Sequence, residues 1–137
     1  RKPELIIKLL QALALQVGNE VSYNELGQLL NVDKQTIEEY ITILEQAFII
    51  YKLPSLQRNM RNELKKAKKI YFWDIGIRNA LINNTNPLDL RSDSGAIREN
   101  VAITERKKYL DNNQQFAQTY FWRTQTQQEI DYIEEVG

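Results

Sequence analysis

The sequence has neither cysteine nor histidine among its 137 residues. Without cysteine the chain forms no disulfides and offers no thiolate ligand to a metal. Without histidine it lacks the usual general base, so Ser-His-Asp and Cys-His catalysis and nearly all zinc chemistry are excluded. Any catalysis would therefore rest on carboxylates, lysine, tyrosine or a bound cation.

Long hydrophobic runs are also absent. No apolar stretch approaches the roughly 18 residues of a membrane-spanning helix, and no secretory signal is visible, so we expect a cytoplasmic protein with no membrane partner. The chain also has no net charge, because its 18 Lys and Arg residues balance its 18 Asp and Glu residues. This balance argues against a protein whose whole surface is basic and neutralises nucleic acid.

What is present begins with the segment from Ser22 to Leu44, which predicts two short helices joined by a tight turn. Ser22 and Glu25 can form a capping box at the start of the first helix. Asn31 tolerates the left-handed conformation that the turn needs, and Asp33 is a good N-cap for the second helix. Such a helix-turn-helix presents its second helix outward, often towards a DNA major groove.

The order of the surrounding elements predicts an α+β fold. A helix from Pro3 to Gly18 precedes the motif, and short β-branched or aromatic segments at 48–53 and 70–73 predict two strands. The long polar stretch between these strands, residues 55–69, is expected to be a loop. Three helices followed by two strands around a basic loop is the order of a winged helix-turn-helix.

A second unit follows a short helix that begins after Asp74. The sequence NNTNP predicts a break, and we place a linker at residues 83–92. Beyond it we expect a helix from about Asp93 to Leu110 and two strands at 119–123 and 129–134. The predicted domains are therefore residues 1–82, a winged helix-turn-helix, and residues 93–137, the start of a second domain.

The outward face of the second motif helix gives a mixed signal about DNA. Lys34, Gln35 and Thr36 at its start suit contacts to bases or phosphates. Glu38 and Glu39 on the same face are unfavourable next to phosphate. We therefore favour a module used for protein contacts or as a scaffold over a helix that reads bases.

The segment before the second strand is the better candidate for nucleic-acid contact. In a winged helix it would be the wing, and its cations could release several counterions and give a steep salt dependence. An equally weighted alternative is a solvated loop, or one paired with acidic partners. The candidate contact residues here are Arg58, Arg61, Lys65, Lys66, Lys68 and Lys69.

Two acids of the second unit carry possible chemistry. Glu99 lies in the apolar stripe of Ala96, Ile103 and Leu110, where a buried carboxylate is costly unless it is paired or binds a cation. The favoured alternative is a stripe edge where Glu99 reaches water or Arg106.

The other acid is Asp131, which shares one strand face with Glu129. A symmetric turn would pair Arg123 with Glu129 and place Phe121 opposite Asp131, with the Arg123–Glu129 ion pair fixing the register. Asp131 is then left without an obvious cationic neighbour. Together with Glu99 it could hold Mg²⁺ through oxygen ligands, although a third group is missing.

Four segments in this order resemble a known family: ITILEQAFIIYKLP, RNMRNELKKAKKIYFWDIGIRNAL, GAIRENVAITE and YFWRTQTQQEIDYI. They are similar to the C-terminal region of prokaryotic AAA+ family ATPases, in which a P-loop module is followed by a winged helix and a PD-(D/E)xK nuclease-like domain. The resemblance covers nearly the whole chain. It implies a winged helix followed by the first helix and β-hairpin of a restriction-endonuclease-like domain, with Glu99 and Asp131 as catalytic residues and Mg²⁺ ligands.

The resemblance also implies that the chain is a fragment. No E-x-K strand completes the site before Gly137, and no P-loop is present, so we expect no enzyme activity and no cofactor here, with ATP and Mg²⁺ needed by the full-length protein. We expect an accessory region that binds DNA or a partner protein and couples it to the ATPase module of the same full-length chain. The alternatives are a Mg²⁺-dependent nuclease in the intact protein and a non-catalytic interaction or oligomerisation module.

Overall fold

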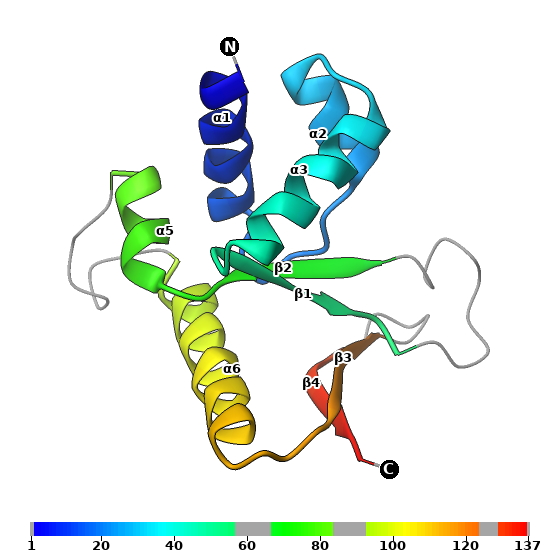
Figure 1. Cartoon of the computed structure of the whole chain (residues 1–137), viewed down its shortest axis with the longest axis vertical. Coiled ribbons are helices and arrows are strands. Elements are labelled where there is room, and N and C mark those ends of the chain that lie inside the picture. Colours follow the sequence, from blue (N-terminus) through cyan, green and yellow to red (C-terminus); the bar gives the residue numbers. More distant parts are fainter. Residues whose placement is uncertain (1, 57–66, 84–92, 124–128, 137) are drawn as a thin grey trace.

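The computed structural model is an α+β structure, as the sequence predicts. It describes residues 2–56, 67–83, 93–123 and 129–136, and in these ranges it contains five helices and two antiparallel strand pairs (Figure 1). No helix within these ranges is both long and apolar enough to cross a bilayer. The elements are α1 (Lys2–Leu15), α2 (Tyr23–Leu30), α3 (Lys34–Gln46), β1 (Ile50–Pro54), β2 (Lys68–Phe72), α5 (Ile75–Leu81), α6 (Ser94–Asn112), β3 (Gln118–Arg123) and β4 (Glu129–Glu135).

The predicted N-caps Ser22 and Asp33 and the predicted left-handed turn residue Asn31 are confirmed. The Ser22 hydroxyl accepts a hydrogen bond from the Glu25 N–H at 3.2 Å. Asn31 adopts the left-handed conformation with a φ of 59°, and the Asp33 carboxylate accepts the Thr36 N–H at 2.8 Å. Local capping chemistry therefore fixes where both helices begin and how the turn between them runs.

The first strand pair, β1–β2, differs from the prediction at its start. Phe48 is not in the strand: it adopts a left-handed φ of 58° in the turn after α3 and is 75% exposed. The antiparallel register runs from Ile50 opposite Phe72 to Pro54 opposite Lys68. The physical reason is that α3 must reverse direction before the chain can pair, and residues 47–49 make that turn.

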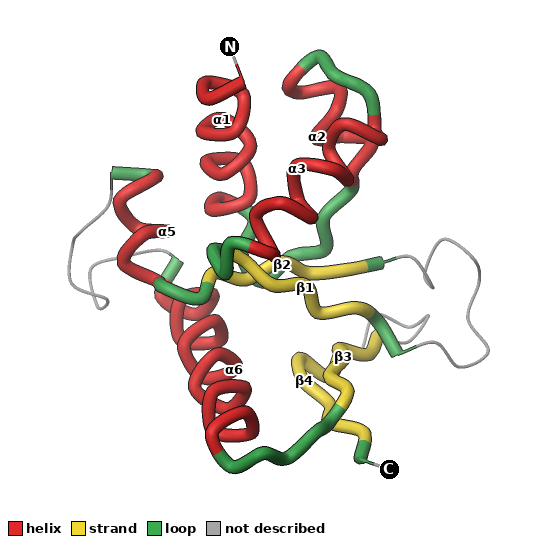
Figure 2. Tube along the Cα trace, viewed as in Figure 1, coloured by secondary structure: helices red, strands yellow, loops and turns green. Residues whose placement is uncertain are grey.

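The outer edge of β2 is covered by other parts of the chain (Figure 2). At one end the Val21 N–H donates to the Lys68 carbonyl at 2.9 Å. At the other end the Asn100 amide of α6 bonds to Phe72 as a strand would. It accepts from the Phe72 N–H at 3.0 Å and donates to the Phe72 carbonyl at 2.8 Å. These bonds attach both the α1–α2 segment and α6 to the same strand.

The second strand pair, β3–β4, has the predicted register at the turn and a bulge further on. Arg123 lies opposite Glu129, but Trp122 pairs with Ile130 and Tyr120 pairs with Ile133. Two residues of β4, Asp131 and Tyr132, therefore face Phe121, where the sequence predicts Asp131 alone. The Leu56 N–H donates to the Phe121 carbonyl at 2.8 Å, which joins this pair to the end of β1.

The apolar core lies between the helices of the first half and the β1–β2 pair. Leu9, Leu13, Ile37, Ile41 and Ile70 are almost fully buried there, and the core cluster also includes Ile103 of α6 and Phe121 of β3. Both halves of the described chain thus contribute to one core. The predicted linker and domain bounds stay predictions, because residues 84–92 lie outside the described ranges.

Candidate functional site

Strands β2 and β4 carry a group of charged residues that meet in the structure. The Lys69 side chain is 1% exposed. Its Nζ atom lies 2.5 Å from Glu129 Oε2, 3.8 Å from Asp131 Oδ1 and 4.8 Å from the centre of the Phe121 ring. A buried ammonium requires such anionic partners, because desolvation would otherwise remove its charge. We call Lys69, Glu129 and Asp131 the strand cluster.

The two carboxylates of the strand cluster affect each other's protonation. A hydrogen bond with Glu129, burial and the charge of Glu99 raise the pKa of Asp131 to about 6. Burial also acts to raise the pKa of Glu129, but hydrogen bonds from Asp131 and Lys69 outweigh it and hold that pKa below its ordinary value. As pH falls, Asp131 is therefore protonated before Glu129.

Glu99 lies beside the strand cluster on α6. Its Oε2 atom accepts a hydrogen bond from the Tyr71 hydroxyl. Burial first, and then this bond, raise the pKa of Tyr71 above its ordinary value, so the hydroxyl stays protonated as a donor. The predicted stripe is confirmed, since Ile103 and Leu110 are buried. The favoured alternative is that Glu99 reaches water or Arg106. Only its Arg106 part is wrong, because Arg106 forms a two-point ion pair with Glu134 at 2.6 and 3.0 Å.

The arginine predicted to fix the hairpin register has a different partner. Arg123 is opposite Glu129 in the sheet, but its guanidinium is 2.6 Å from Glu20 Oε2. Glu129 pairs with Lys69, and Lys69 also gives Asp131 the cationic neighbour that it was expected to lack. The bulged hairpin thus has ion pairs to the segment before α2 and to β2.

A Mg²⁺ ion does not fit the side chains around this site as they are arranged. Mg²⁺ prefers several oxygen ligands at about 2.0–2.1 Å in octahedral geometry. Here Glu129 is bonded to an ammonium and Glu99 accepts from a tyrosine hydroxyl. Within the described ranges, no three carboxylate side chains converge on a possible metal position. The assignment of Glu99 and Asp131 as metal ligands and catalytic residues stays a prediction.

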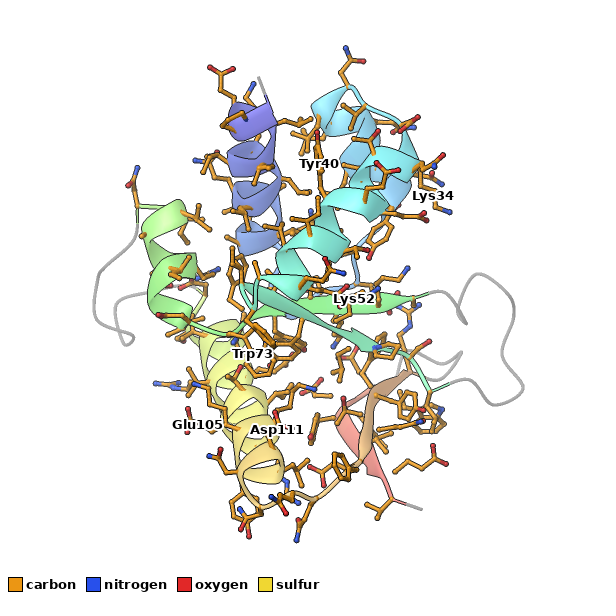
Figure 3. All side chains as sticks on the ribbon, viewed as in Figure 1. Lys34, Tyr40, Lys52, Trp73, Glu105 and Asp111 are labelled. Atoms are coloured by element: carbon orange, nitrogen blue, oxygen red, sulfur yellow. The ribbon has the colours of Figure 1, made fainter. Side chains whose placement is uncertain are left out.

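The residues predicted to contact nucleic acid divide into three groups. Lys34 and Gln35 are exposed on the first turn of α3, and Thr36 is half-buried beside them; Figure 3 shows Lys34 on the outer side of this helix. Lys68 lines the same surface cleft as Lys34, which has a volume of about 580 Å³. Lys69 is in the interior, so it offers no surface to a nucleic acid. The remaining four, Arg58, Arg61, Lys65 and Lys66, lie outside the described residues.

Sequence reasoning missed the buried polar partners of α6 and β4. Tyr51 and Thr104 share a hydrogen bond of 2.8 Å, Tyr71 bonds to Glu99, and Lys69 bonds to Glu129. One signal was available. Strand alternation places Lys69 and Tyr71 on one face of β2, with Lys68 on the other. That pattern separates the interior Lys69 from the half-buried Lys68, although it does not identify the partners of Lys69.

Comparison with known proteins gives a family for the larger part of the chain. Residues 94–137 match the domain of unknown function DUF4143. The uncharacterized proteins Rv2008c of Mycobacterium tuberculosis and Mb2031c of Mycobacterium bovis are each 29% identical over 128 residues, which covers 91% of this chain and 28% of each relative. No solved structure matches. Residues 1–88 match the domain of unknown function DUF8612, and the chain belongs to that family.

Proposed function

We propose that this chain is a winged-helix module that binds nucleic acid beside the ATPase motor of a longer AAA+ family protein. Support for the winged helix comes from the element order, with three helices followed by β1 and β2. It also comes from the strand-like pairing of residues 20 and 21 with β2. The proposed ATPase motor is supported by the sequence resemblance of this chain to the C-terminal region of AAA+ family ATPases. The chain spans 28% of the length of its curated relatives, so the ATPase activity, ATP and Mg²⁺ are proposals about a longer protein.

The observation that carries this proposal is the cleft shared by α3 and β2. Lys34 on the first turn of α3 and Ala67 and Lys68 at the start of β2 line the same cleft of about 580 Å³. Lys68, a member of the basic segment 58–69, therefore lies beside the exposed start of α3. A duplex that contacts Lys34 and Gln35 would meet Lys68 without any rearrangement of the described elements.

The acidic residues of the same cleft favour a second candidate, a protein partner. Glu20, Glu25 and Glu38 also line it, although Glu20 is paired with Arg123. Glu38 and Glu39 are exposed on α3, and carboxylates next to phosphates cost binding energy. A basic protein surface would match these carboxylates on α3.

Binding of labelled duplex DNA to the 137-residue chain, measured by fluorescence anisotropy over a salt series, tests the proposal. We expect an affinity that falls steeply with salt, and a Lys34→Ala variant that binds more weakly with a salt slope smaller by about 1. Lys8→Ala, an equal change of charge at an exposed site on α1, should bind as the unaltered chain does.

A second variant separates the two candidates. Arg61→Ala combined with Lys65→Ala should weaken DNA binding at low salt if the basic segment contacts the backbone. The nucleic-acid proposal is refuted if the chain binds no DNA at low salt, or binds it with an affinity that does not depend on salt. If the double variant leaves DNA binding unchanged but alters assembly with a partner protein, the protein-contact candidate is supported instead.

A further inference from the structure

We propose that Lys69 is the built-in cation of the β4 carboxylates, so that its ammonium holds the β3–β4 pair on β2 without a divalent metal. In this assignment the strand cluster is a docking contact within the chain. It is independent of the nucleic-acid proposal, because Lys69 and Lys68 lie on opposite faces of β2 and only Lys68 lines the cleft.

The first argument is the position of the ammonium. Lys69 is 1% exposed, and its Nζ atom lies over the Phe121 ring at 4.8 Å while it contacts Glu129 at 2.5 Å and Asp131 at 3.8 Å. The aromatic face and the two carboxylates stabilise a charge that has left water. Residues of β3 and β4 thus contact the ammonium of a side chain that has almost no exposure to solvent.

The second argument is the competition between charges. A divalent cation at the Asp131 and Glu129 oxygens would sit within a few ångströms of the ammonium, and the two positive charges would repel each other strongly at a half-buried site. Glu99, the other nearby carboxylate, already accepts the Tyr71 hydroxyl. The acids that resemble metal ligands in sequence are thus paired with groups of β2 in the folded chain, Asp131 with the Lys69 ammonium and Glu99 with the Tyr71 hydroxyl.

The third argument is that the contact joins segments far apart in the sequence. Besides the strand cluster, β3–β4 contacts the first half through the Leu56 to Phe121 backbone bond, the Arg123–Glu20 ion pair and the burial of Phe121 in the core. An isolated strand pair is marginally stable in water. The Lys69 contact adds to these attachments by tying the carboxylates of β4 to β2.

The test is thermal unfolding of the chain in EDTA, in Mg²⁺ and in Mn²⁺, together with calorimetric titration of each ion. We expect the unaltered chain to show the same Tm in all three and no heat of binding. Lys69→Met keeps the length of the side chain but removes its charge. We expect it to lower Tm in EDTA by about 5 °C or more and to make Tm rise when Mn²⁺ is added, because the carboxylates then lack a counter-ion.

Lys52→Met on β1 is the matched control, since Lys52 is 39% exposed and pairs with Glu45 at 3.4 Å. It should change neither Tm nor its response to metal. The proposal is overturned if the unaltered chain shows a saturable heat of Mg²⁺ binding and a higher Tm in Mg²⁺, and if the Asp131→Asn variant loses both effects. The titration of the unaltered chain decides this even if Lys69→Met does not fold. Hydrogen exchange at the Leu56 amide gives a second measurement. If Lys69 holds β3–β4 on β2, this exchange should be faster in Lys69→Met than in the unaltered chain.

Discussion

Replacing Asn100 by leucine should destabilise the chain by about 3 kcal/mol. Asn100 is 1% exposed, and its amide satisfies both the N–H and the carbonyl of Phe72. Leucine has a similar volume but leaves the Phe72 N–H unpaired, and it leaves the Phe72 carbonyl with only a long bond of 3.4 Å from the Thr104 hydroxyl. Each unpaired buried group costs about 1–3 kcal/mol. Two such groups together cost about 2–6 kcal/mol. The long Thr104 bond and the burial of the apolar side chain recover part of this cost, so the net loss of about 3 kcal/mol lies in the lower half of that range.

Urea unfolding followed by the fluorescence of Trp73 and Trp122 measures this loss. The control is Asn112→Leu, the same chemical change at an exposed position of the same helix, which should alter the free energy of unfolding by less than about 0.5 kcal/mol. A loss below about 1 kcal/mol in Asn100→Leu, with an unchanged dependence on urea, would refute the reasoning, because it would mean that Phe72 finds other partners or water.

Asn100→Asp turns the same site into a pH-dependent one. Its carboxylate would still accept the Phe72 N–H but would face the Phe72 carbonyl, so the folded state should raise the pKa of the new acid above the unfolded value of about 3.9. The folded state then binds more protons, and stability relative to the unaltered chain is lost as pH rises through this window. Each unit of pKa shift is worth about 1.4 kcal/mol. An equal stability gap between the two proteins at pH 4.5 and pH 7 would contradict this.

Two further predictions concern ion pairs. Arg78 is 3% exposed, donates to the Ala14 carbonyl at 2.8 Å and pairs with Asp93 at 2.6 Å, so Arg78→Leu should cost about 3 kcal/mol of unfolding free energy in urea. Arg98→Leu on the exposed face of α6 should cost little, and equal costs would refute the role of the pair. The hydrogen bond from Arg106 holds the pKa of Glu134 below its ordinary 4.5, so its stabilisation is complete above that pH and is lost as pH falls. Glu134→Gln should therefore flatten the acid side of the stability curve measured by circular dichroism, and an unchanged curve would show that the bond is not maintained in solution.

Local chemistry made the first half of the fold predictable. Ser22, Asn31 and Asp33 act on backbone groups within three or four residues of themselves, so their effect does not depend on the rest of the chain. The register at Arg123 and Glu129 follows from the length of the turn for a similar reason. The start of β1 was less predictable, because the β-forming preference of Phe48 competes with the turn that must follow α3.

The candidate site was predictable in position but not in its contacts. Helical spacing placed Glu99 in the buried stripe, and strand alternation placed Asp131 beside Glu129. Which groups meet those acids depends on how β2 packs against α6 and β4, and this is decided by contacts between segments about 30 to 60 residues apart. Lys69 shows the difficulty most clearly, since in sequence it is one of several cations in a basic segment and in the structure it is interior.

The pairing of Asn100 with Phe72 has a consequence for how the protein behaves among its own copies. A sheet edge with unpaired N–H and carbonyl groups can add a strand from another molecule, and this is a common route to aggregation. On β2 the Lys68 end is met by Val21 and the Phe72 end by the amide of Asn100. A single side chain on a helix thus takes the place of a neighbouring strand and closes this end of β2 to intermolecular pairing.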